Sequence, residues 1–179
     1  TAAAFRVKDT NTVAKVLALV AELRAEWLRG AGLTPVEDHS MLSDLRTAAI
    51  VTPTARISWL CAPRVDSAAV FSELLGGPSA GYFSIATGDG GEPSGQRYLG
   101  DTMVLETTFP TFTVTDYLEV SAERTAQIAG RSDLLRVIEG TGSAVVEFAP
   151  RLDFGRVPTQ LLVDDDGVAV MGTADLMVL

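Results

Sequence analysis

After Thr34, apolar and polar residues alternate in short segments that are separated by turn residues. Alternation places successive side chains on opposite faces, which is typical of half-buried β-strands, and the intervening Gly, Pro and Asp residues indicate turns. One short helix is expected at residues 70–75. Many short strands with little helix predict a mainly β fold, an antiparallel β-sandwich (super-sandwich) or a barrel. The predicted strands are residues 46–52, 56–61, 82–86, 97–100, 103–109, 112–120, 134–139, 143–149, 160–164 and 168–173.

The first 33 residues follow a different pattern. Residues 3–8 are predicted to form a short strand, and residues 9–12 supply polar side chains that can cap a helix. Apolar residues then recur at helical spacing from Val13 to Leu28, which predicts one N-terminal amphipathic helix. We therefore predict two parts: a strand–helix linker segment at 1–33, which could be the end of a preceding domain, and a β-sandwich domain at 34–179.

The composition argues against several classes of protein. The chain has a net charge of −9, whereas nucleic-acid binding depends on basic side chains that neutralise phosphates. No apolar run approaches the roughly 18–20 residues that a membrane span needs. One cysteine and one histidine allow neither an intrachain disulfide nor a His/Cys zinc site. We expect no cofactor, no metal, no nucleic-acid partner and no membrane partner.

The cysteine count suggests a cellular location, and the chain ends suggest that a longer protein is involved. A single cysteine fits a reducing compartment, and no signal-peptide pattern is visible, so we expect a cytoplasmic location. The chain begins at Thr1 and ends on an apolar run at residues 176–179. We therefore expect it to be a piece of a longer protein.

Four motifs occur in one order along the chain. Residues 35–67 contain R-T-A-A, I-S-W-L-C and P-R-V-D-S. Residues 97–107 read R-Y-L-G-D-T-M-V-L-E-T, residues 114–117 read V-T-D-Y and residues 150–155 read P-R-L-D-F-G. Together they resemble the N-terminal β-sandwich of glycoside hydrolase family 15, the group of glucoamylases, glucodextranases and bacterial trehalases.

The chain departs from that family at the hairpin around Ala55. The family pattern D-G-S-I-D-W is here Thr54-Ala55-Arg56-Ile57-Ser58-Trp59. The hairpin thus lacks the glycine that takes a positive φ easily, and it lacks one aspartate. We expect a remodelled loop whose role beside an active site could be altered or lost.

The resemblance implies an inverting glycosidase, which needs two carboxylic acids about 6.5–9.5 Å apart. In the family both belong to a helical (α/α)-barrel that follows the sandwich. We therefore assign no catalytic residue and expect no turnover by these residues alone. The resemblance implies that the partner is the catalytic (α/α)-barrel of the same parent chain, and that the substrate is a small saccharide, an α-glucoside or trehalose.

A second resemblance concerns the N-terminal segment. Residues 3–29 are similar to the last elements of a trehalose-6-phosphate phosphatase of the haloacid-dehalogenase class. That resemblance implies a phosphatase fused to a family 15 module, and it makes trehalose metabolism the natural setting.

Four residues of the motifs are candidates for binding a saccharide: Trp59, Arg64, Asp66 and Tyr98. The indole of Trp59 could stack on a sugar ring, but alternation places it on one face with Ile57 and Cys61, which favours core packing. Tyr98 could donate to sugar hydroxyls or be a half-buried strand residue.

The charged residues of the motifs also have a structural interpretation. Asp116 shares a face with apolar neighbours, so it should pair with an arginine or with backbone donors. Residues 164–167 are predicted to form a hairpin turn. The aspartates of the motifs could line a sugar site, or they could cap turns and pair with arginines. The aspartates are Asp38, Asp44, Asp66, Asp101 and Asp116, and the arginines are Arg46, Arg64, Arg97 and Arg151.

Three functions remain open from the sequence. The first is a non-catalytic accessory β-sandwich that packs on a catalytic barrel and shapes it. The second is a free-standing carbohydrate-binding module, which requires an exposed aromatic platform. The third is a structural spacer between a trehalose-phosphatase and a glycosidase-like domain, which the changes at Ala55 and Ser58 favour.

Overall fold

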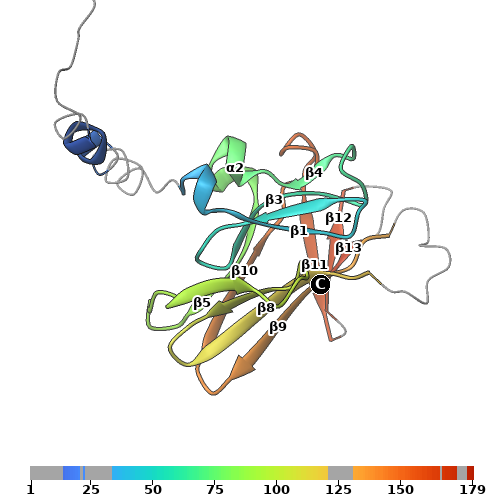
Figure 1. Cartoon of the computed structure of the whole chain (residues 1–179). Helices are drawn as coiled ribbons and strands as arrows, with labels where there is room; N and C mark the ends of the chain where they lie inside the picture. Colours follow the sequence, from blue (N-terminus) through green and yellow to red (C-terminus); the bar gives the residue numbers. More distant parts are fainter. Residues whose placement is uncertain (1–13, 21, 23–33, 121–130, 166, 173–176) are drawn as a thin grey trace, which may run out of the picture. The chain divides into compact units, whose positions relative to one another are not determined.

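The computed structural model describes residues 14–20, 22, 34–120, 131–165, 167–172 and 177–179 (Figure 1). The chain divides into two compact units, Thr1–Asp38 and His39–Leu179. In the first unit residues 14–20 and 22 are helical, which agrees with the predicted helix, and a 3₁₀ turn, η1, spans Val36–Asp38. The strand predicted at 3–8 and the caps at 9–12 lie outside the described residues.

The second unit is built from antiparallel strands, as predicted (Figure 1). One sheet has six strands, in the order β1-β2-β3-β5-β10 with β4 paired to β3, a second has the order β6-β7-β8-β9, and a third has the order β11-β12-β13. The first sheet comprises β1 (Ser40–Ser43), β2 (Ala48–Val51), β3 (Arg56–Cys61), β4 (Ala69–Phe71), β5 (Tyr82–Thr87) and β10 (Ala144–Ala149).

The other elements follow. The second sheet comprises β6 (Gly95–Tyr98), β7 (Leu105–Thr108), β8 (Phe112–Leu118) and β9 (Leu134–Gly140). The third sheet comprises β11 (Gln160–Asp164), β12 (Gly167–Met171) and β13 (Met177–Val178). A short helix α2 (Glu73–Gly76) and a 3₁₀ turn η2 (Pro78–Ala80) lie between β4 and β5.

The ten predicted strands all have counterparts, but β1, β4 and β13 were missed and the helix expected at residues 70–75 is wrong. Residues 69–71 form β4, and α2 begins only at Glu73. All three residues of β4 are buried, so this segment shows no alternation by which a strand could be recognised. β1 and β13 are short, and β1 is largely polar.

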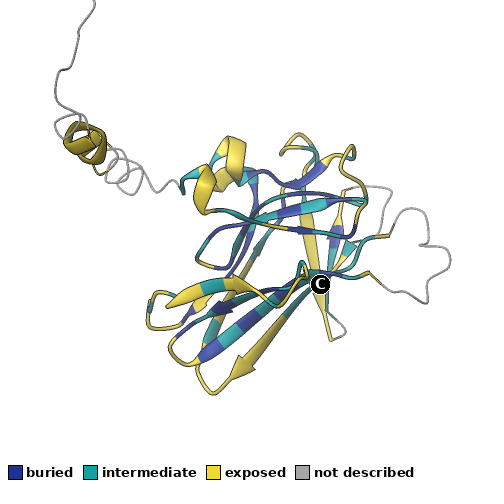
Figure 2. Cartoon of the chain, viewed as in Figure 1, coloured by how far each residue is buried: buried dark blue, intermediate teal, exposed yellow. Residues whose placement is uncertain are grey.

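β8 shows most clearly why these residues form strands. Its seven residues alternate strictly between buried and half-buried positions, so one face lies in the core (Figure 2). Two clusters of buried apolar side chains make up that core, and burial of each large side chain stabilises the fold by about 1.5–3 kcal/mol. The larger cluster contains Leu42, Ala49, Val51, Ile57, Leu60, Val70, Phe71, Phe83, Leu105 and Leu118, and the smaller one contains Ala55, Ile85, Phe109, Phe112 and Val114.

A β-bulge in β3 changes which face Trp59 occupies. Ile50 pairs with Trp59 but Val51 pairs with Ile57, so Ser58 is an extra residue in the ladder. Ile57 and Leu60 therefore enter the core, while Trp59 is only half-buried. The prediction that Ile57, Trp59 and Cys61 share one buried face is wrong for Trp59, although Cys61 is buried as expected.

Candidate functional site

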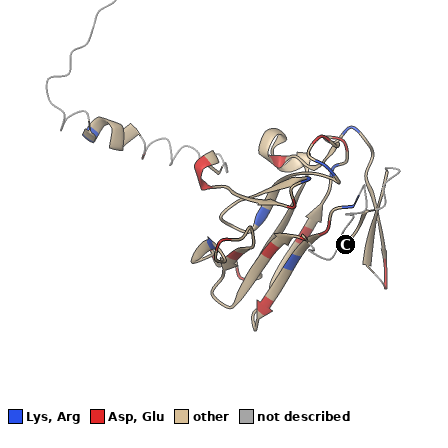
Figure 3. Cartoon of the chain, turned by 45° about the vertical axis from the view of Figure 1, so that its right-hand side comes forward, with Lys and Arg blue, Asp and Glu red and all other residues tan. Residues whose placement is uncertain are grey.

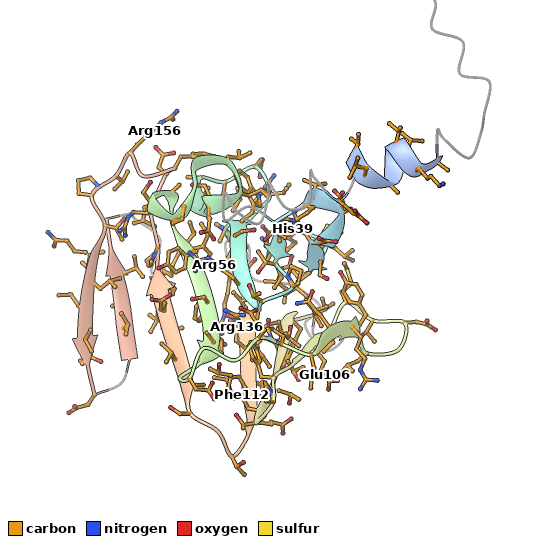
Figure 4. All side chains as sticks on the ribbon, turned by 90° about the vertical axis from the view of Figure 1, so that its left-hand side faces the viewer. His39, Arg56, Glu106, Phe112, Arg136 and Arg156 are labelled. Carbon is orange, nitrogen blue, oxygen red and sulfur yellow. The ribbon has the colours of Figure 1, made fainter. Side chains whose placement is uncertain are left out.

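A buried ion pair lies within the second sheet, and its arginine also bonds to the first sheet. Arg136 on β9 donates from Nε to Asp116 Oδ1 at 2.8 Å and from Nη2 to Asp116 Oδ2 at 3.1 Å. The side chains are 3% and 0% exposed, and Figure 4 shows Arg136 in the interior. Arg136 also donates to the carbonyls of Phe83, at 2.8 Å, and Ala55, at 2.6 Å, which both belong to the first sheet or its hairpin. The expectation that Asp116 pairs with an arginine is confirmed.

The hairpin between β2 and β3 closes without the family's glycine. Ala55 takes the left-handed conformation with φ 55° and is fully buried. Its N–H donates to the Thr52 carbonyl at 3.2 Å, and the N–H of Thr52 donates to the Arg56 carbonyl at 2.8 Å. An alanine in this conformation costs roughly 1–2 kcal/mol. The turn geometry is thus retained at the cost of backbone strain.

Tyr98 ties the second sheet to the edge of the first. Its hydroxyl donates to the carbonyl of Met41 at 2.9 Å and accepts from the N–H of the same residue at 2.8 Å. Gln96 on the same strand accepts from Ser40 Oγ at 2.8 Å and donates to the Thr52 carbonyl at 3.0 Å. Because both capacities of the Tyr98 hydroxyl are used, this geometry favours its structural interpretation.

Arg64 and Asp66 pair with each other in the loop after β3. Arg64 Nε lies 2.8 Å from Asp66 Oδ1, and Nη2 lies 3.0 Å from Oδ2, with side chains 63% and 66% exposed. The hydrogen bond from Arg64 lowers the pKa of Asp66 below its usual value. The pair is open to solvent, so it contributes little to stability.

The other predicted pairings are partly wrong. Arg97 pairs with Glu106 at 2.8 Å and not with an aspartate, and Arg151 donates to the carbonyl of Pro150. Asp44 does cap a turn, because its carboxylate accepts from the N–H groups of Arg46 and Thr47 at 2.9 and 2.8 Å. The turn at residues 164–167 is the predicted hairpin, in which Asp164 pairs with Gly167.

Trp59 meets an aromatic residue from another motif. Its ring centroid lies 5.9 Å from that of Phe154, and the two rings are tilted by 52°. Phe154 is 44% exposed and has a φ of 57°. The loop that follows β10 therefore presents an aromatic side chain to solvent beside the outer face of β3.

One cavity of about 590 Å³ lies in the second unit, within the part of it that the structure describes. Its walls come from the loop after β3, from residues 131–133 before β9, from the loop after β10, and from β13. The residues that line it are Ala62, Pro63, Ser67, Ala68, Ala69, Val70, Arg131, Ser132, Asp133, Leu152, Asp153, Met177 and Val178.

The four predicted saccharide-binding residues do not form one site through contacts with one another. Within the described residues, the hydrogen bonds and ring contacts of Trp59, Arg64, Asp66 and Tyr98 join only Arg64 to Asp66. None of the four lines the cavity. Two charged residues that line the cavity were not predicted as site residues. Arg131 lies outside the motifs, whereas Asp153 is part of the P-R-L-D-F-G motif.

Charge and hydropathy add two observations. Acidic and basic residues are interspersed along the strands of the second unit (Figure 3). Among the residues that the structure describes, no helix is long and apolar enough to cross a membrane.

Comparisons with known proteins agree with the geometry. Residues 22–179 match the family model described as trehalase-like, N-terminal. The chain is 30% identical over 142 residues to the trehalase of Mycobacterium tuberculosis, an alignment that covers 69% of this chain and 21% of that protein. It is 29% identical over 142 residues to the trehalase of Mycolicibacterium smegmatis, with the same coverage of 69% and 21%.

A trehalase of Thermoplasma volcanium is 34% identical over 79 residues, which are 44% of this chain and 13% of that protein. No solved structure matches the chain. The chain spans about a fifth of the length of the first two relatives. The phosphatase resemblance at residues 3–29 stays a prediction. Because the family model extends over most of its residues, this chain belongs to the trehalase-like N-terminal domain family.

Proposed function

We propose that this chain is a non-catalytic accessory domain of a trehalase-like glycoside hydrolase, and that it packs on a separate catalytic barrel of the same longer chain. The relatives are named trehalases, and the matched part is 21% of the length of two of them. The proposal assigns bond cleavage to the remainder of the enzyme, and it gives residues 34–179 the role of a supporting β-sandwich.

The observation that carries this proposal is the exposed apolar edge formed by β11. All five residues of β11 are exposed, and the strand lies at one end of its sheet (Figure 2). Leu161, Leu162 and Val163 are 42%, 56% and 76% exposed. Proteins seldom leave an apolar edge strand uncovered, because its free N–H and C=O groups invite pairing. We propose that the catalytic barrel covers it.

The carboxylates support the non-catalytic part of the proposal. Asp116 is fully buried against Arg136, Asp44 caps a turn and Glu106 pairs with Arg97. A pair of acids that inverts a glycosidic bond must face an open site that admits water and sugar. The paired carboxylates of this chain hold strands and turns together instead.

The test compares the full-length protein with the isolated chain. The double substitution Leu162→Asp and Val163→Asp should lower the Tm and the trehalose hydrolysis of the full-length protein, because charges would be buried at the contact. It should leave the Tm of the isolated chain nearly unchanged. Val145→Asp is the matched control, since Val145 on β10 is 46% exposed. Equal responses of the full-length protein and the isolated chain would remove the case for docking.

Two finer points belong to the same proposal. A cytoplasmic location fits the single thiol of Cys61, which is buried and needs no partner cysteine. The alternative of a free-standing carbohydrate-binding module has one supporting observation, the ring pair in which Phe154 is exposed and Trp59 is half-buried. In that alternative the isolated chain would bind sugar through this ring pair.

A further inference from the structure

The cavity lies where three loops and the last strand meet. Ala69 and Val70 of β4 and Leu152 are almost fully buried and form an apolar part of its wall. Met177 of β13 lines it and packs against the larger core cluster. The cavity of about 590 Å³ falls within the range of small-molecule sites, roughly 300–1,000 Å³. Val70 and Met177 therefore connect the apolar part of this wall to the core.

Asp153 supplies a hydrogen-bond acceptor to this cavity. Its side chain is half-buried and lines the wall, and in the described part of the chain its carboxylate has no hydrogen-bond or ionic partner. Its backbone is left-handed with φ 48°, and Phe154 and Gly155 follow with φ 57° and 78°. Strained residues persist where the surroundings fix them, and they cluster at ligand sites.

Hydrogen bonds hold this strained loop in place. The N–H of Gly155 donates to the Leu152 carbonyl at 3.0 Å, and the N–H of Arg156 donates to the Asp153 carbonyl at 3.0 Å. The N–H of Leu152 donates to Thr159 Oγ1 at 3.1 Å. These bonds hold the backbone at Asp153 in its left-handed conformation.

Arg131 supplies hydrogen-bond donors to the same cavity. Its Nε donates to both carboxylate oxygens of Asp133, at 2.8 and 2.9 Å. Among the described residues, its Nη1 and Nη2 groups have no acceptor. A guanidinium carries five N–H donors, so several remain for a ligand. The hydrogen bond to Asp133 raises the pKa of Arg131 above its usual range, and a guanidinium is charged in any case.

From these groups we infer that the cavity is a binding site for a small neutral saccharide. Asp133 and Asp153 outnumber Arg131 on the walls, which disfavours an anionic ligand. A sugar hydroxyl both donates and accepts, so it satisfies a free carboxylate and free guanidinium N–H groups at once. The apolar base matches the C–H face of a pyranose ring. The choice of a saccharide rests on the proposed function, whereas the site itself rests on the cavity.

Trehalose and maltose are the probes for this inference. Nuclear magnetic resonance titration of the 179-residue chain should shift the amide signals of Val70, Leu152 and Val178, which line the cavity. We expect a Kd on the order of 1 mM, as for a small ligand held by a few polar contacts. Shifts confined to the Trp59–Phe154 pair, or no shifts with either sugar, would overturn the inference.

Asp153→Gly separates binding from folding. Glycine adopts the left-handed conformation without strain, so the Tm should stay equal or rise while trehalose affinity falls at least tenfold through loss of a charged acceptor. Asp101→Asn is the control, because Asp101 is an exposed carboxylate in another of the motifs and is not among the lining residues. Unchanged affinity in Asp153→Gly would contradict the inference.

The titration and the docking test can each contradict one proposal without contradicting the other. If the β11 substitutions destabilise the full-length protein but the isolated chain binds neither sugar, only the cavity inference is lost. If the chain binds trehalose through Asp153 but the β11 substitutions act equally on both proteins, only the docking proposal is lost.

Discussion

Arg136 and Asp116 lie on neighbouring strands of one sheet, yet the guanidinium of Arg136 also binds two carbonyls of the opposite sheet and its hairpin, at 2.8 and 2.6 Å. The ion pair is thus part of a network that spans the sandwich. Each nitrogen of the guanidinium has at least one acceptor, which helps a buried charge to be tolerated.

Arg136→Met should reduce the free energy of unfolding by about 3–5 kcal/mol, because it leaves the Asp116 carboxylate buried and unpaired. Urea denaturation of the isolated chain measures the change. The double variant Asp116→Leu with Arg136→Met should recover part of the loss. Arg97→Ala, which breaks an exposed pair with Glu106, is the control and should cost less than about 1 kcal/mol. An equal effect of the two arginine substitutions would contradict the network.

Ala55→Gly should change stability by less than about 1 kcal/mol. Relief of the left-handed strain is worth roughly 1 kcal/mol, and loss of the buried methyl group costs about 0.8 kcal/mol. Ala55→Val should destabilise by about 2 kcal/mol or more, because a β-branched residue is a severe outlier at this φ and the site is packed. Thermal denaturation of both variants gives the comparison. A well-tolerated valine would mean that the turn is not left-handed in solution.

Tyr98→Phe should lower the free energy of unfolding by about 1 kcal/mol, the net value of the hydrogen bonds to Met41. Under the proposed function, its effect on the KM of the full-length protein for trehalose should be negligible, since the hydroxyl is already occupied by the backbone. Tyr117→Phe on β8 is the control for the loss of a hydroxyl. A raised KM with unchanged stability would instead give Tyr98 a place in sugar binding.

Stability should decline at alkaline pH because of Cys61. Burial raises the pKa of this thiol, so the folded state retains its proton at a pH where the unfolded chain has released it. The contribution is fully present below the unfolded pKa of about 8.5 and is lost as the pH rises through the higher folded value. Denaturation curves from pH 7 to 10 should show this slope in the wild type and a weaker one in Cys61→Ala. Identical slopes would exclude Cys61 as the cause.

Phe154→Ala distinguishes the two surfaces that we propose as candidates for sugar binding, the cavity and the Trp59–Phe154 ring pair. Loss of the ring pair with Trp59 should cost about 0.5–1.5 kcal/mol of stability, while the trehalose affinity of the isolated chain should remain within about twofold of the wild type, since Phe154 does not line the cavity. Isothermal titration measures the affinity. A large loss of affinity would favour the carbohydrate-binding module with an aromatic platform.

The alternation of apolar residues was sufficient for most of the fold. β8 follows it at every position, and the hairpin of β11 and β12 forms at the predicted acidic turn. β4 could not be recognised, because three buried residues carry no period. Trp59 was assigned to the wrong face because a bulge at Ser58 shifts the register, and a bulge depends on the partner strand.

The candidate site was less predictable than the fold. Arg136 and Arg131 lie outside the motifs, so their roles follow only from what the strands bring near them. The motif around Asp153 was visible in the sequence, but its left-handed backbone is fixed by hydrogen bonds within the folded loop. The four residues chosen from motifs alone remain untested as sugar ligands.

Strand β9 ends one sheet and β10 ends another, and residues 141–143 are all the chain that lies between them. The short connection from β9 to β10 therefore joins the two larger sheets directly, so separating the sheets would displace an edge strand of one of them. We therefore expect the two sheets to unfold together as one cooperative unit, which fits a rigid domain better than one that bends between its sheets.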